Sequence, residues 1–277
     1  MITRRRFILG AAGIALVGGT GYGVHAARQF VVQTVPLKLA GWDGPPMRAV
    51  FLTDMHRGPY VTSDYLHEIA RATAELDPDL LLHGGDYVYA SRHYFDEALE
   101  PFARIAPPAG SWGVLGNHDH SNGAPAAREA MRRHGVGDLT NTAVKLWFNR
   151  NPLWLFGVDD YRTGRPDMAK AVKAVPKEAL CIGLTHNPDL YLSAPLPVEP
   201  PLLLAGHTHG GQVRLPIIGA PFLTHGHGSA FESGQRQVGK SLVHVSRGIG
   251  TIALPVRFNC PPEITVIKIS GLSAGNS

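Results

Sequence analysis

Acidic and histidine side chains recur in five short motifs whose order and composition indicate a metal site. The motifs are Asp54-x-His56, Gly85-Asp86, Gly116-Asn117-His118-Asp119, His186 and Gly206-His207-x-His209. Imidazole, carboxylate and amide groups together suit borderline cations such as zinc, manganese or iron. A single structural zinc ion would need only four ligands and would favour cysteine, of which the chain has two. The motifs therefore predict a pair of catalytic ions.

Five of these side chains follow apolar runs that are typical of buried strands. The runs are 47–53, 80–82, 112–115, 180–184 and 202–205, and the residues after them are Asp54, Asp86, Asn117, His186 and His207. Helices are expected at 64–76, capped by Ser63, and near 95–104 and 166–174. In helix-covered sheets, ligands gather beyond the carboxyl ends of the strands. The five side chains are therefore expected at one edge.

The second half of the chain is richer in strands. A hairpin is expected from 144–148 and 153–158, with further strands at 242–246 and 264–269. The sequence contains no linker long enough to separate two domains. We therefore predict an α/β fold, called α+β in some schemes, in which two packed mixed β-sheets are flanked by helices. One domain would span residues 27–270, and a flexible tail would follow at 271–277.

Together, these motifs resemble those of the calcineurin-like metallophosphoesterases, whose pattern is D-x-H, G-D, G-N-H-[DE], H and G-H-x-H. The likeness covers about residues 47–213. Segments 246–250 and 257–264 resemble the end of an exported or membrane-associated bacterial branch, which includes broad phosphodiesterases and UDP-diacylglucosamine pyrophosphatases. Each motif alone is a weak signal, but five in this order are highly specific. The resemblance implies a four-layer sandwich and hydrolysis of phosphodiesters or pyrophosphates.

The resemblance also implies a role for each site residue. Asp54, His56 and His209 would hold the first ion, Asn117, His186 and His207 the second, and Asp86 would bridge both. His118 would protonate the leaving oxygen, and Asp119 would orient His118 and favour its charged form. Two divalent or trivalent ions (manganese, zinc or iron), about 3.5–4 Å apart, would clamp the phosphate and share the attacking hydroxide.

Other residues near the motifs allow several interpretations. Residues 85–89 match the G-D-x-x-Y motif of purple acid phosphatases, whose tyrosine binds iron. Those enzymes lack the histidine found here at position 56, so we interpret Tyr89 as a packing or rim residue. His83 is expected to be buried, and His120 either borders the substrate or is solvated. We favour a mobile loop over a third metal site for His225 and His227.

Glycines flank several of the predicted ligands. Gly85, Gly116 and Gly206 are expected to let the backbone turn sharply before each ligand, and Gly210 and Gly211 to do so after His209.

The apolar stretch 215–223 allows two interpretations. It is either a hairpin packed on the core or a lip that receives a lipid-linked substrate.

Residues 1–26 are expected to form a twin-arginine export signal. Arg4, Arg5 and Arg6 precede an apolar stretch that extends to Val24, and cleavage is expected after Ala26. An uncleaved membrane anchor is the alternative. Both interpretations place the folded domain in the periplasm or at the outer face of the cytoplasmic membrane, and the first requires the twin-arginine export machinery.

The charge balance argues against a nucleic-acid partner. The net charge is +4, and three of the basic residues lie in the expected signal. The remainder shows no basic patch.

The two cysteines and the alternative functions stay open. Cys181 is interpreted as a core residue, and a disulfide between Cys181 and Cys260 is neither predicted nor excluded. Alternative functions are an exported phosphomonoesterase or a catalytically silent metal-binding envelope protein, although a silent relative should have lost His118 or Asp86.

Overall fold

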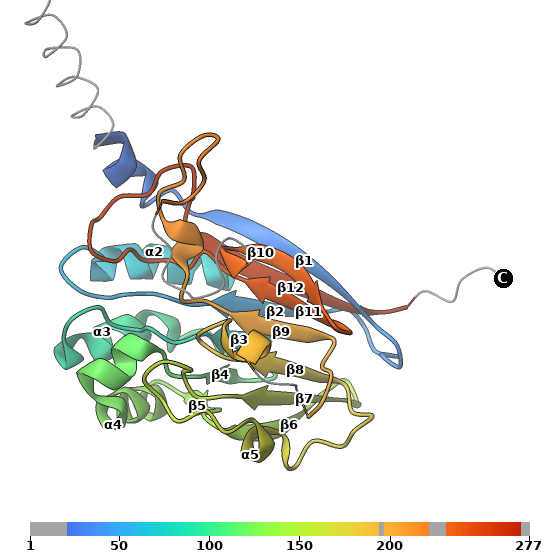
Figure 1. Cartoon of the computed structure of the whole chain (residues 1–277). Coiled ribbons are helices and arrows are strands. Elements are labelled where there is room, and N and C mark those ends of the chain that lie inside the picture. The colour runs from blue at the N-terminus through green and yellow to red at the C-terminus, as the bar shows by residue number, and fades with distance from the viewer. Residues whose placement is uncertain (1–20, 194–196, 222–230, 273–277) are drawn as a thin grey trace, which may run out of the picture.

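Two six-stranded β-sheets pack against each other in the computed structural model, which describes residues 21–193, 197–221 and 231–272. The strand order is β1-β12-β2-β3-β4-β5 in the first sheet and β10-β11-β9-β8-β7-β6 in the second. Helices lie outside the sheets, giving four layers (Figure 1). The predicted fold class is therefore confirmed.

The first sheet is mostly parallel. Strands β2, β3, β4 and β5 run parallel, β12 is antiparallel to β2, and β1 is parallel to β12. The strands are β1 (Val31–Leu39), β2 (Met47–Leu52), β3 (Leu80–His83), β4 (Ser111–Gly113), β5 (Val136–Asp138) and β12 (Glu263–Gly271). The helices between them are α2 (Ser63–Glu75), α3 (Phe95–Leu99), α4 (Asn117–Arg133) and the 3₁₀ turns η1 (Arg92–Tyr94) and η2 (Glu100–Phe102).

The second sheet has a parallel centre and antiparallel edges. Strands β7, β8, β9 and β11 are parallel, whereas β6 and β10 are antiparallel to their neighbours. The strands are β6 (Thr142–Phe148), β7 (Asn151–Gly157), β8 (Cys181–Leu184), β9 (Leu202–Ala205), β10 (Gly234–Val238) and β11 (Ser241–Val245). The helices are α5 (Met168–Val172), α6 (Leu190–Ser193) and the 3₁₀ turn η3 (His209–Gly211).

The layers explain why the central strands are continuous apolar runs. Phe51 and Leu82 of the first sheet share one buried cluster with Leu155 and Leu204 of the second. Leu81 faces the other way, into a cluster that includes residues of α2, α3 and α4. Strands buried on both faces need apolar side chains at successive positions. This burial fixes the strand ends, and hence the position of the residues that follow them.

Several predicted boundaries need correction. Thr62, not Ser63, caps α2 by accepting a hydrogen bond from the Tyr65 N–H. The helix predicted at 95–104 is divided into α3 and η2, where Pro101 enters the first turn. The hairpin is confirmed, and both residues of its turn, Asn149 and Arg150, have positive φ. Both cysteines are buried and free, so the open disulfide does not form.

The chain before β1 lies against the loop before β12. Residues 21–26 are helical, the Arg257 N–H donates to the Gly23 carbonyl at 2.9 Å, and the Tyr22 ring meets Phe258 edge-on. Within the described ranges, no helix has the length and apolar character needed to cross a membrane. The predictions for residues 1–20 and 273–277 lie outside the described residues.

Candidate metal centre

All seven predicted ligands come together at the carboxyl ends of strands from both sheets. Loops of the first sheet supply Asp54 and His56 after β2, Asp86 after β3, and Asn117 at the first position of α4. Loops of the second sheet supply His186 after β8, and His207 and His209 after β9. Residues 153 positions apart meet directly, since the His207 N–H donates to the Asp54 carboxylate at 2.9 Å. The site therefore joins the two sheets.

One group of donor atoms belongs to Asp54, His56 and His209. Asp54 Oδ1 lies 3.4 Å from His209 Nε2 and 3.7 Å from His56 Nε2. The two imidazole Nε2 atoms are 2.9 Å apart. All three residues are buried. This is the set that the resemblance implies for the first ion.

A second group is formed by Asn117, His186 and His207. His186 Nε2 lies 3.2 Å from Asn117 Oδ1 and 3.2 Å from His207 Nδ1. Asp86 lies between the groups, because its Oδ2 is 3.1 Å from His186 Nε2 and 3.5 Å from His56 Nε2. This position suits a bridging carboxylate.

The donor chemistry fits metal ions. Nδ1 of His186 lies 2.8 Å from the Gly84 carbonyl, to which it donates, so its Nε2 faces Asp86 and Asn117 and is the nitrogen that a cation there would bind. Orientation of a ligating imidazole by a backbone carbonyl is common in metal sites. Nitrogen and oxygen donors crowd together here in a buried space, and a cation would satisfy them. The Asp54, His56 and His209 group and the Asp86, His186 and His207 group each have the close donor spacing that an ion requires.

The backbone at these positions is unusual. Asp54, His56, Asp86, His207 and His209 all have φ between +48° and +72°. Non-glycine residues rarely adopt this conformation, which costs on the order of 1–3 kcal/mol each and is concentrated at functional sites. Backbone bonds between the loops hold it, since the N–H groups of Asp54 and His56 donate to the carbonyls of Gly85 and Asp86.

Two of the glycines act by their small size. Of the three glycines before the ligands, Gly85 has a positive φ, of +87°, and Gly116 and Gly206 do not. A Cβ atom on Gly116 would lie 2.2 Å from Asp86 Oδ1, and one on Gly206 would lie 2.3 Å from Asp54 Oδ2. These glycines let the ligand carboxylates approach the neighbouring backbone. Gly210 and Gly211, after His209, both have positive φ.

His118 stands beside both groups without being fully buried. Its Nδ1 donates to the Tyr89 carbonyl at 2.6 Å, and its ring stacks on Tyr89 at 5.4 Å between centroids. Its ring also meets His56 edge-on. Burial lowers the pKa of His118 from its ordinary value, and the charge of Asp86 opposes this shift. Tyr89 is thus a packing residue that positions His118.

The predicted role of Asp119 is wrong in its detail. Its buried carboxylate accepts hydrogen bonds from the N–H groups of Asp86, Tyr87 and Gly116 at 2.8–2.9 Å. The orienting partner of His118 is instead the Tyr89 carbonyl. Asp119 therefore braces the loop that carries Asp86 against the start of α4, and acts on His118 only through that loop.

Histidines control the charge of the two site carboxylates. Burial alone would raise the pKa of Asp54, but His209, His56 and His186 hold it well below its usual range. The same balance applies to Asp86, for which burial is outweighed mainly by the charge and hydrogen bond of His186. Both carboxylates are therefore ionised at neutral pH, as metal ligands must be.

Arg162 was missed by the sequence reasoning. It lines a cavity of about 160 Å³ together with Asp86, Asn117, His118, His207, His209 and Ile252. Its loop is held by Asp160, whose carboxylate accepts from the N–H groups of Arg162 and Thr163. The adjacent Asp159 pairs with His120 at 2.6 Å, so His120 is a structural partner of this loop. The feature of the sequence that could have indicated this loop is the acidic pair of Asp159 and Asp160 soon after β7.

The remaining predicted residues divide between confirmed and corrected positions. His83 is buried, as expected, and lies 3.1 Å from Ser111 Oγ. The 215–219 turn is not packed on the core, because Ile217 and Ile218 are 107% and 72% exposed. The lip interpretation stays a prediction. His225 and His227 lie outside the described residues.

Comparison with known proteins agrees with this geometry. Residues 47–211 match the family model of the calcineurin-like phosphoesterases. The chain belongs to this family. Phosphodiesterase YaeI of Escherichia coli is 31% identical over 97% of this chain and 100% of its own length. The uncharacterized metallophosphoesterase YkuE of Bacillus subtilis is 31% identical over 97% and 98%. Among solved structures, TT1561 of Thermus thermophilus is similar, with 14% identity, a TM-score of 0.46 and coverage of 74% of this chain and 91% of that one.

Proposed function

We propose that this chain is an exported phosphodiesterase that uses two metal ions. The observation that carries the proposal is the convergence of two donor groups on Asp86, beside a cavity lined by His118 and Arg162. When bound, two such ions supply positive charge that neutralises phosphate oxygens and makes the attacking water acidic. The ions are manganese, zinc or iron, since the donor set suits each of them.

The chain's own residues would bind the substrate and move the proton. Arg162 would donate to the phosphate oxygens, as a guanidinium suits that group. His118 would protonate the leaving oxygen from its Nε2 when the imidazole carries both protons, because its Nδ1 proton is held by the Tyr89 carbonyl. The charge of Asp86 supports this protonated form against burial. Asn117, the carboxylates of Asp54 and Asp86 and the four ligand histidines would hold the ions.

A diester is favoured over a monoester by two observations. The full-length relative named above is a phosphodiesterase. A second, apolar cavity shares His209 and Ile252 with the site cavity, which leaves space for a second ester group. A phosphomonoesterase is the alternative within the class. The substrate would be an envelope or extracellular phosphoester, a lipid-linked one included, if the N-terminal segment directs export by the twin-arginine machinery or anchors the protein at the membrane.

The test is hydrolysis at defined metal content. Purified protein is loaded with manganese, zinc or iron, its ions are counted by mass spectrometry, and mono- and diesters are compared. We expect two ions per chain and a higher kcat/KM for diesters. Asp86→Ala should lose metal, and retention of two ions would refute the bridge. Two bound ions without hydrolysis of any ester would favour the silent metal-binding protein.

A further inference from the structure

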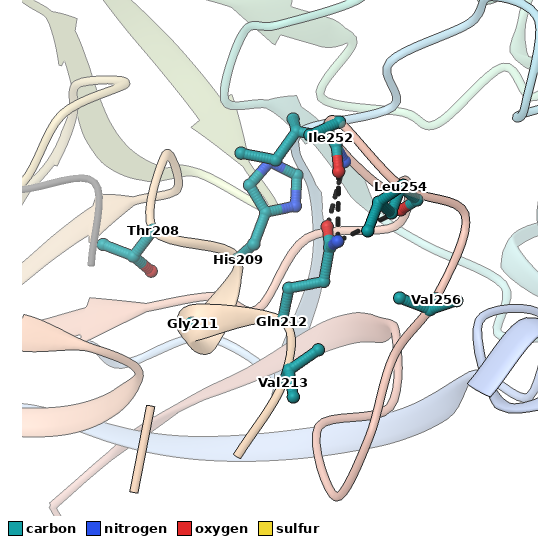
Figure 2. A pocket seen from close by; sticks show the side chains of 9 residues that line it. Thr208, His209, Gly211, Gln212, Val213, Ile252, Leu254 and Val256 are labelled. Carbon is teal, nitrogen blue, oxygen red and sulfur yellow. Dashed lines mark hydrogen bonds between the residues drawn. The ribbon is translucent and has the colours of Figure 1, made fainter. Parts of the chain in front are cut away.

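An apolar groove adjoins the metal centre. It has a volume of about 270 Å³ and is lined by Val213 on one side and by Ile252, Ala253, Leu254 and Val256 on the other. His209 and Ile252 lie at one end, and Val213 and Val256 at the other (Figure 2). His209 and Ile252 also line the cavity that contains Asp86 and His118. The groove therefore leads away from the predicted reaction centre.

The polar groups of this groove are turned away from a ligand. The Gln212 side chain donates to the carbonyls of Ile252 and Leu254 at 3.1 Å and accepts from the Ile252 N–H at 2.9 Å (Figure 2). These bonds tie the two walls together and use the amide of the one long polar side chain in the lining. Apart from the His209 imidazole at the end that adjoins the metal centre, what remains for a ligand is aliphatic surface.

The wall from Ile252 to Val256 is fixed by the chain that follows it. Arg257 is fully buried and donates to the carbonyls of Arg247, Gly248 and Gly250 at 2.6–3.2 Å. On the other wall, Val213 is bridged to Phe258, with the Arg214 N–H donating to the Phe258 carbonyl. Even so, Leu254 is 61% exposed. A preformed apolar groove with an exposed apolar rim favours a ligand that covers it.

We propose that this groove binds an aliphatic chain of the substrate, so that the enzyme acts on phosphoesters that carry such a chain. The inference rests on the phosphodiesterase function proposed above and names its substrate class. With the phosphate between the ions and Arg162, one ester group would leave toward His118. The other would extend past His209 and Ile252 into the groove.

The test is a series of nitrophenyl alkyl phosphodiesters with methyl, butyl and octyl groups. Each methylene that enters an apolar site should raise kcat/KM by about fourfold, up to the length of the groove. Leu254→Asp should abolish this rise, so that the methyl and octyl esters are cleaved with similar kcat/KM. Ile218→Asp is the matched control, because it also replaces an exposed apolar residue but lies outside the groove lining. It should keep the rise.

The outcomes separate this inference from the function on which it rests. Hydrolysis with no dependence on chain length would overturn the groove and leave the phosphodiesterase intact. If Ile218→Asp abolishes the rise and Leu254→Asp does not, the aliphatic group of the substrate binds at the 215–219 turn and the groove proposal is wrong. If no ester is cleaved, calorimetry tests whether the groove binds an aliphatic chain. Octyl phosphate should bind the metal-loaded protein more tightly than inorganic phosphate, and Leu254→Asp should remove that difference. Equal affinities in the wild-type protein would overturn it.

Discussion

His118 differs from the other histidines of the site in its exposure. Its ring is only half-buried, with Nδ1 donating to the Tyr89 carbonyl, whereas His56, His186 and His209 are buried among carboxylates. His118 also lies near His56 and Asp86, in a group that could itself hold an ion. A single substitution separates the acid from the ligand role.

We expect His118→Ala to keep two ions and to slow hydrolysis of an alkyl leaving group by about 10²- to 10⁴-fold. A nitrophenyl group leaves as a stable anion and needs little protonation, so its hydrolysis should slow far less. The measurement is kcat for both esters at known metal content. Equal losses would contradict the acid role, and loss of an ion would make His118 a ligand.

Arg162 has a proposed role in binding the phosphate that no sequence motif indicates. Hydrogen bonds from charged groups contribute about 1.5–3 kcal/mol, so Arg162→Ala should lower kcat/KM by about 10- to 150-fold. Arg165→Ala, an exposed arginine of the same loop, is the matched control and should have little effect. Comparable losses in both variants would show a general effect of positive charge rather than contact with the phosphate.

At the scale of elements, the strands that deliver the ligands were predictable because of burial. Strands β2, β3, β8 and β9 are covered on both faces, so their sequences are short apolar runs with clear ends. Edge strand β1 has four exposed residues at its start and gave no such signal. Helix α4 was missed because Gly123, with φ of +121°, and Pro125 interrupt it.

The loops after the strands could be predicted only in part. Ligand types and order were visible in the motifs, and the distances agree with the two groups. The left-handed φ of five ligands, the steric role of Gly116 and the three N–H donors to Asp119 depend on how loops from distant parts of the chain pack together. No local pattern encodes such contacts.

Gly206→Ala tests the steric explanation. The added methyl group would lie 2.2 Å from Thr53 Oγ1 and 2.3 Å from Asp54 Oδ2, so the Asp54 carboxylate must move. We expect the variant to lose at least the first ion, as counted by mass spectrometry after metal loading, while its circular dichroism stays native. Gly41→Ala is the control. Its methyl group would meet nothing within 4 Å, although φ is +79°, so it should cost only about 1 kcal/mol and keep both ions. Full metal content in Gly206→Ala would refute the explanation.

At the scale of the whole molecule, Glu263, the first residue of β12, connects the first sheet to the second. Its buried carboxylate lies 3.0 Å from His244 Nε2 of β11 and accepts from Arg247 Nε at 2.7 Å. Burial alone would raise its pKa, but His244, Thr265 and Arg247 lower it to about 2. The ionised Glu263 carboxylate and its partners therefore stabilise the folded protein at pH values above 4.5, the pKa of the unfolded state. This contribution is lost as the pH falls towards 2, the pKa in the folded state.

Glu263→Gln should therefore lower the free energy of unfolding by about 3 kcal/mol at pH 7, since each pKa unit corresponds to about 1.4 kcal/mol. The difference from the wild-type protein should shrink by about 2 kcal/mol at pH 3. Urea unfolding of the metal-free proteins at both pH values measures it. A difference that does not depend on pH would indicate lost packing instead of lost charge pairing.

The origin of the ligands in both sheets has a consequence for the protein's biosynthesis. The group of Asp54 and His56 is completed by His209, and the group of Asp86 and His186 is completed by His207. A nascent chain that has not yet reached His207 thus holds neither complete group, even if its first sheet has already formed. Loading of these two groups would therefore follow synthesis of most of the chain and docking of the second sheet, whereas the group of His56, Asp86 and His118 is complete once the first sheet has formed.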